Sequence, residues 1–204
     1  RGIWTAKKRY ILNVWDSEGV RYEKAKLKIM GIEAIKTSTP APCRKFLKDA
    51  FGLLMTGTED EVIDYIAHCR EEFNALPPEE VAFPRSVSQI TKWKSSSDMY
   101  NKGCPIHVRG AILYNHWTKK KKLNNKYAAI QSGEKIKFCY LKTPNWMHEN
   151  VISFIQDFPT ELDLNKYVDY ELQFNKSFME PIKVILDCIG WETERRNTLD
   201  SFFA

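Results

Sequence analysis

Two short motifs combine basic and hydrogen-bonding side chains suited to binding a polyanion. They are Lys7-Lys8-Arg9-Tyr10, and His107 with Arg109 two residues later. A lysine near a tyrosine on one face of a strand can span from phosphate to sugar or enter a minor groove. A histidine and an arginine at the start of a predicted helix, near backbone N–H groups, suit a phosphate. For the first motif, an exposed basic strand end without a ligand is the alternative.

Side chains capable of catalysis show no recognised arrangement. Glycine-rich phosphate loops, a G-x-S-x-G nucleophile elbow, an H-E-x-x-H pair and an Asp-x-Asp pair are all absent from the sequence. Helix capping explains the acidic run Glu59-Asp60-Glu61. The five cysteines stand far apart without a C-x-x-C pair, which favours reduced thiols over disulfides or zinc. We therefore predict no catalytic residue and no metal site in this chain.

Charge alternates in four blocks along the 204 residues, whose 43% hydrophobic content suffices for a folded core. Residues 1–50 carry 12 basic and 5 acidic side chains, and residues 83–144 carry 13 and 2. Residues 51–82 carry 1 and 8, and residues 145–204 carry 5 and 11. Converging basic blocks would bind a polyanion such as nucleic acid, with solvated charge as the alternative. Because no apolar run approaches ~18 residues, we expect no membrane partner.

The residue pattern predicts a mixed α+β fold that begins with a β-hairpin. Residues 3–30 form the predicted hairpin, with residues 7–15 in its first strand and a turn at residues 16–19. Apolar spacing of three and four predicts a helix from Thr39 or Pro40 to Gly57. The capping box formed by Thr58 and Glu61 starts a second helix, which should pack antiparallel to the first.

The remaining segments predict a mixed body with C-terminal helices. Strands are expected near 81–83, at 135–141 and at 151–156, and helices near 88–94, at 107–118 and at 162–188. The last helix should bend or break near Pro181. Residues 95–103 are a predicted loop. Residues 119–125 form a predicted basic loop that either contacts phosphates or is solvated.

Four ordered stretches resemble the B-family replicative DNA polymerases, most closely those of tailed bacteriophages. The first is Lys7-Lys8-Arg9-Tyr10 followed by Leu12-Asn13-Val14-Trp15-Asp16, which is similar to the family's Lys-Lys-x-Tyr motif. The others are residues 26–31 with 38–40, residues 104–110 with Tyr114-Asn115, and the C-terminal tail. The resemblance extends over nearly the whole chain, and the common order of the four motifs argues against coincidence.

The resemblance implies a set of DNA contacts. Lys8 and Tyr10 would lie at the minor groove near the primer end, where contacts are nearly independent of sequence. His107 and Arg109 match the thumb's His-x-Arg motif and would hold phosphates. The full implied set is Lys7, Lys8, Tyr10, Lys28, Lys36, Thr37, Ser38, Ser86, Ser88, His107 and Arg109. Within this set, residues 28 and 36–38 would lie at the palm–thumb junction. Ser86 and Ser88 are weaker candidates for neutral phosphate contacts.

The resemblance also implies a domain organisation and partners. Residues 1–35 would be the C-terminal strands of the palm, 36–195 the thumb and 196–204 a tail that binds a sliding clamp. Leu199, Phe202 and Phe203 could form one apolar plug for the clamp, or fold onto their own domain. The catalytic aspartates and their Mg²⁺ would belong to the remaining N-terminal part of the polymerase. This chain would then hold no cofactor and be inactive alone.

We therefore expect the C-terminal palm and thumb part of a phage DNA polymerase, which binds primer–template duplex in the cytoplasm of the infected bacterium. Since residue 1 is Arg rather than Met, we expect a longer parent chain, although a split polymerase would also fit. The alternative is a stand-alone nucleic-acid-binding or replisome adaptor module without polymerase ancestry. An independent nuclease or transferase finds no support in the residues.

Overall fold

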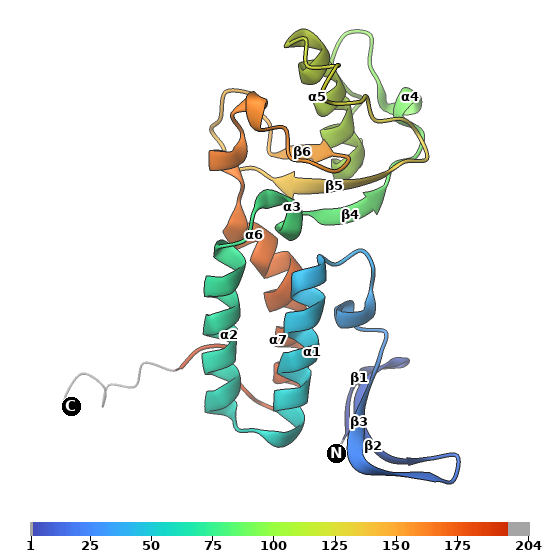
Figure 1. Ribbon diagram of the computed structural model, residues 1–204, viewed down its shortest axis with the longest axis vertical. Coiled ribbons are helices and arrows are strands. Elements are labelled where there is room, and N and C mark those ends of the chain that lie inside the picture. Colours follow the sequence, from blue (N-terminus) through green and yellow to red (C-terminus); the bar gives the residue numbers. More distant parts are fainter. Residues whose placement is uncertain (1, 196–204) are drawn as a thin grey trace, which may run out of the picture. The chain divides into compact units, whose positions relative to one another are not determined.

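The computed structural model describes residues 2–195, and their contacts divide the chain into two units. Unit 1 comprises residues up to 36, residues 42–75 and residues from 175 onward. Unit 2 comprises residues 37–41 and 76–174. Each unit contains helices and a three-stranded antiparallel sheet (Figure 1), so the predicted α+β class is confirmed.

The sheet of unit 1 has three strands where the sequence predicted a two-stranded hairpin. The strands β1 (Gly2–Ala6), β2 (Arg9–Ser17) and β3 (Val20–Met30) lie in the order β1-β2-β3. The chain reverses at Lys7 and Lys8, and Lys8 has φ 63°. The sequence did not predict this turn, because the residues around it contain no Gly, Pro, Asn or Asp.

Helices complete unit 1, and the local helix signals were accurate. Helix α1 (Ala41–Thr56) begins within two residues of the predicted start, and α2 (Glu59–Asn74) follows after a short connection. The predicted capping box is present: the Thr58 hydroxyl accepts from the Glu61 N–H, and the Glu61 carboxylate accepts from the Thr58 N–H at 2.8 Å. Figure 1 shows α1 and α2 running antiparallel, as predicted.

The C-terminal helical region is shorter and more irregular than the predicted helix 162–188. Two 3-10 turns, Thr160–Leu162 and Asn165–Tyr167, precede α6 (Tyr170–Phe174). A π-helical turn, Asn175–Met179, then leads into α7 (Glu180–Asp187). The irregularity lies where the sequence predicted a bend, because Pro181 lacks the N–H that a regular helix would donate.

Unit 2 is built on a second antiparallel sheet covered by one long helix. Its strands β4 (Phe83–Ser86), β5 (Lys135–Tyr140) and β6 (Val151–Phe154) lie in that order, and α5 (Ile106–Lys120) packs on β6. The short helices α3 (Pro78–Val81) and α4 (Ile90–Trp93) flank β4 in sequence.

Two boundaries in unit 2 correct the sequence predictions. Val81 ends α3, so the predicted strand near 81–83 starts only at Phe83. The predicted basic loop starts later as well, because Lys119 and Lys120 form the last turn of α5. Lysines are favourable there, since they face the negative end of the helix dipole. In the part of the chain that the structure describes, no helix is long and apolar enough to cross a bilayer.

Candidate nucleic-acid interface

One exposed face of the unit 1 sheet brings Tyr10 together with lysines from β3. In the register of β2 and β3, Tyr10 lies opposite Met30, Leu12 opposite Lys28, and Val14 opposite Lys26. Side chains of alternate residues share a face, so these rows lie on one side of the sheet. The opposite side buries Ile3 and Ile11, which are 5% and 0% exposed. The outer face therefore presents a tyrosine hydroxyl and two exposed ammonium groups.

Lys7 and Lys8 occupy a position that the sequence assigned wrongly. They form the turn between β1 and β2 rather than alternating along a strand, so Lys8 and Tyr10 are not neighbours on one strand face. The two lysines are exposed at the end of the sheet. Gly31 packs directly against the backbone of this turn. A β-carbon at Gly31 would lie 2.3 Å from the Lys8 carbonyl oxygen, so only glycine fits there.

Lys36 is an exposed lysine that already has a partner in the chain. Its Nζ donates to Glu33 Oε1 at 2.7 Å, and the other Glu33 oxygen accepts from Arg9 at 3.1 Å. Partial burial by itself raises the pKa of Glu33, but the Lys36 hydrogen bond and the Arg9 charge lower its pKa overall. At neutral pH, Glu33 therefore offsets much of the charge that Lys36 could offer to a phosphate.

In unit 2, Arg85 binds the backbone of one predicted contact, Ser38, and affects the ionisation of another, His107. The Arg85 guanidinium donates to the Ser38 carbonyl oxygen at 2.8 Å and to the Pro84 carbonyl oxygen at 2.8 Å. It also lies close enough to affect the ionisation of His107. Sequence reasoning missed Arg85. The only signal was its place in the basic block 83–144.

His107 is a hydrogen-bonding group rather than a charged one at neutral pH. Burial, together with the nearby Arg85 charge, lowers the pKa of His107 from its ordinary value of 6.5. Its ring lies 6.4 Å from that of Phe138. A neutral imidazole still has one N–H to offer to a phosphate oxygen.

His107 and Arg109 do not point toward one common phosphate, although the sequence suggested that they would. Both residues lie in the first turn of α5, as predicted, but residues two apart point about 200° apart around a helix axis. Arg109 is bound within unit 2: its guanidinium donates to Asn150 Oδ1, and its Nε lies 3.9 Å from Glu149 Oε2. The Arg109 side chain is 23% exposed and that of Glu149 18%.

Tyr100 completes the surroundings of Arg109. Its ring centroid lies 5.5 Å from the guanidinium carbon, and its hydroxyl donates to Glu149 Oε1 at 2.6 Å. Partial burial and the Glu149 carboxylate raise the pKa of Tyr100, so the hydroxyl stays protonated. Sequence reasoning missed Glu149, which lies 40 residues after Arg109 in an acidic block and carried no motif.

The remaining predicted contacts are spread over the surface. Thr37, Ser86 and Ser88 are exposed, whereas Ser38 is half-buried. Ser86 ends β4 opposite Lys135 of β5. The predicted clamp-binding residues Leu199, Phe202 and Phe203 lie outside the described residues.

The described residues do not form a metal-binding centre, and two of the buried thiols are unreactive. Among residues 2–195, no group of three or more His, Cys, Asp or Glu side chains could hold a metal ion. Burial raises the pKa of the Cys43 thiol to about 12, and that of Cys69 also to about 12. These two thiols stay protonated at neutral pH and are therefore poor nucleophiles.

Comparison with known proteins supports the motif-based resemblance. The chain is 32% identical over 207 residues to a DNA-directed DNA polymerase of Escherichia phage RB69. It is 29% identical over 206 residues to that of Enterobacteria phage T4. Each match includes 99% of this chain but 22% of the relative, so the chain spans about a fifth of the length of these curated relatives. No protein-family model matches the chain. The predicted resemblance to phage DNA polymerases is confirmed.

Proposed function

We propose that this chain is the C-terminal palm and thumb part of a phage DNA polymerase and that it binds primer–template duplex during replication in the bacterial cytoplasm. The observation that carries the proposal is the outer face of the unit 1 sheet, where Tyr10 lies with Lys26 and Lys28. Similarity to phage DNA polymerases over 99% of the chain supports the same function.

The sheet face suits contact that does not depend on DNA sequence. The Tyr10 hydroxyl can bond to acceptors in the minor groove, which are similar for every base pair. Lys26 and Lys28 follow on the same face and would neutralise phosphates. Lys7 and Lys8, in the turn at the end of the sheet, would extend the contact. A replicative polymerase needs such a grip because it must hold any product sequence.

Unit 2 would add contacts to the phosphate backbone. His107 offers a neutral donor, and the Arg85 guanidinium, which acts on its ionisation, holds the Ser38 backbone. Exposed hydroxyls of Thr37, Ser86 and Ser88 suit neutral phosphate contacts. Arg109 would reach a phosphate only by exchanging its contact with Glu149.

The chemistry of nucleotide addition would come from other parts of the polymerase. Mg²⁺ supplies charge stabilisation in two-metal phosphoryl transfer when carboxylates hold it. The described residues do not offer that carboxylate cluster, so they do not fit the metal centre. We assign this chain the positioning of the duplex, and its tail, with Leu199, Phe202 and Phe203, the docking of a sliding clamp.

A duplex titration at two salt concentrations tests the proposal. We expect the chain to bind blunt duplexes of unrelated sequence equally, with affinity falling steeply between about 50 and 200 mM salt. The double variant Lys26→Ala/Lys28→Ala should reduce the salt slope by about 2. The matched control Lys45→Ala/Lys48→Ala removes two exposed lysines of α1 and should leave the slope unchanged. Salt-independent binding, or equal slopes for both variants, would contradict the proposal.

A further inference from the structure

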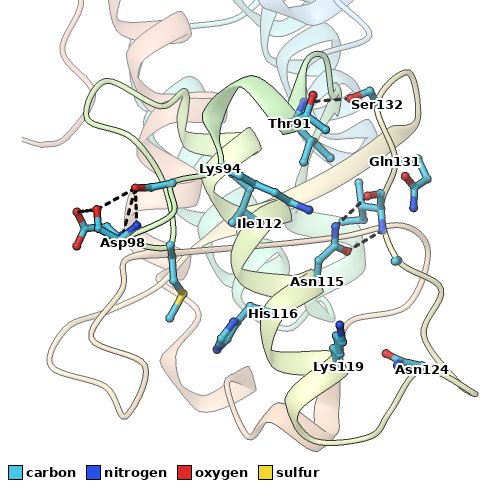
Figure 2. Close-up of a pocket in the computed structure, with 16 residues that line it drawn as sticks. Thr91, Lys94, Asp98, Ile112, Asn115, His116, Lys119, Asn124, Gln131 and Ser132 are labelled. Atoms are coloured by element: carbon cyan, nitrogen blue, oxygen red, sulfur yellow. Dashed lines mark hydrogen bonds between the residues drawn. The ribbon is translucent and has the colours of Figure 1, made fainter.

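A pocket of about 660 Å³ in unit 2 is lined by Lys119 and Asn124 from the segment predicted as a basic loop, and by none of the residues in the implied set of DNA contacts. It opens between α4, the loop after it, α5 and the segment 124–132, as Figure 2 shows. Its apolar lining consists of Ile90, Ile112 and Ile130, each at most 4% exposed, together with the exposed side chains of Met99 and Ala129. The volume is in the range of pockets that hold small organic ligands and exceeds the need of a bare phosphate.

Hydrogen bonds hold the walls of this pocket in place. The Asn115 side chain of α5 grips the backbone of Ile130 twice: its Nδ2 donates to the carbonyl oxygen at 2.9 Å, and its Oδ1 accepts from the N–H at 2.7 Å. Ser132 Oγ accepts from the Ile90 N–H at 3.0 Å and ties the same segment to α4. The pocket is therefore formed before any ligand arrives, which lowers the entropic cost of binding.

Other polar groups around the pocket are not used by the fold. The pocket is lined by the side chains of Lys94, His116 and Lys119 and by the side-chain amides of Asn124 and Gln131. None of these side chains makes a hydrogen bond or ion pair to another residue between 2 and 195. In Figure 2, Lys94 and Lys119 extend toward the middle of the pocket from opposite ends. These groups offer two positive charges and several donors and acceptors to a ligand.

The charge around the pocket selects an anion. Among the described residues that line it, Asp98 supplies the single carboxylate, and this carboxylate accepts from the Ser97 hydroxyl at 3.3 Å. Lys94 and Lys119 outnumber it. A ligand that matches both the apolar lining and the lysines combines a partly apolar body with a negative charge.

We propose that this pocket binds a nucleotide unit. Its phosphate would lie between Lys94 and Lys119, and its base would lie against the apolar lining. Amides carry both a donor and an acceptor, so Asn124 and Gln131 can pair with the edge of a base. A free nucleotide and one unit of a single-stranded nucleic acid share this chemistry. The site shares no residue with the implied set of duplex contacts, and the proposal does not depend on them.

Calorimetric titration of the full chain tests the site with four probes: a deoxynucleoside monophosphate, its nucleoside, inorganic phosphate and a short single-stranded oligodeoxythymidine. We expect the monophosphate to bind at least about tenfold more tightly than the nucleoside or inorganic phosphate, because it uses both halves of the pocket. Tighter binding of the oligonucleotide would identify a single strand as the source, and equal binding a free nucleotide.

Two variants and a control locate the binding. Lys94→Ala/Lys119→Ala should weaken the monophosphate about tenfold or more, since charge-assisted bonds are lost. Ala129→Trp fills the pocket from its exposed wall without changing the charge and should have a similar effect. Lys102→Ala removes an exposed lysine that does not line the pocket and should change affinity less than about twofold.

Three results would overturn the nucleotide site: no binding of monophosphate or oligonucleotide, binding unchanged in both pocket variants, or inorganic phosphate binding as tightly as the monophosphate. If Ala129→Trp fails to fold, the lysine variant decides, because both of its positions are exposed. Failure of wild-type duplex binding would contradict the function proposed above and would leave the nucleotide result untouched.

Discussion

Gly110 of α5 lies directly against Ser153 of β6. A β-carbon at residue 110 would stand 2.4 Å from the Ser153 hydroxyl oxygen and 2.9 Å from its backbone nitrogen. The same hydroxyl donates to the His107 carbonyl oxygen at 2.8 Å. This close approach fixes the first turn of α5 on the sheet, and with it the positions of His107 and Arg109.

Replacing Gly110 with alanine should destabilise the protein. The added methyl forces α5 away from β6, and overpacking of this kind costs about 1–3 kcal/mol of unfolding free energy. Gly52→Ala is the matched control, because Gly52 is also helical but its β-carbon would meet no atom within 4 Å. That variant should be more stable by up to ~1 kcal/mol, from helix propensity alone. Urea unfolding measures both, and equal effects would contradict the packing role of Gly110.

Replacing Gly31 with alanine should damage the lysine turn. Gly31 has φ +66°, and its β-carbon would meet the Lys8 carbonyl oxygen at 2.3 Å. Gly19 has a similar φ of +81° but no atom within 4 Å, so Gly19→Ala measures the backbone strain alone. We expect Gly31→Ala to lose more stability than Gly19→Ala and also to weaken duplex binding. Equal losses would show that the contact with Lys8 does not matter.

Freeing Arg109 should strengthen duplex binding. Glu149→Gln keeps the acceptor for the Tyr100 hydroxyl but removes the carboxylate charge beside Arg109. One additional phosphate contact should increase the magnitude of the salt slope by about 0.9. Asp163→Asn is the control, because it removes an equal charge from the exposed pair with Lys166. If both variants change the slope equally, the effect is general electrostatics and Arg109 makes no specific contact.

The stability of unit 2 should depend on pH through His107. The pKa of His107 is lowered in the folded state, so the unfolded chain binds the proton more strongly. Stability therefore rises with pH across the window between the lowered value and about 6.5, and falls as the solution is acidified through it. Urea unfolding at several pH values should show this slope in the wild type and a smaller one in His107→Gln. Identical slopes would refute the assignment.

Local signals in the sequence determined much of this protein. The capping box of Thr58 and Glu61 depends on groups three residues apart, so it could be read directly, and it starts α2 where expected. The three- and four-residue spacing of apolar side chains predicted α1, because helix geometry places such residues on one side. Four motifs in order were sufficient to indicate a resemblance to phage DNA polymerases, which the comparisons confirm.

Only the tertiary structure shows which charged side chains already have partners within the chain and which are available to a ligand. Nothing near Arg109 in the sequence indicates that Glu149 neutralises it, and nothing near Ser38 indicates that Arg85 binds its backbone. The turn at Lys7 and Lys8 depends on the pairing of β1 with β2 and on space left by Gly31, which is more than twenty residues away. Sequence spacing reports periodicity within one element, whereas charge partners and close contacts depend on how separate elements pack together.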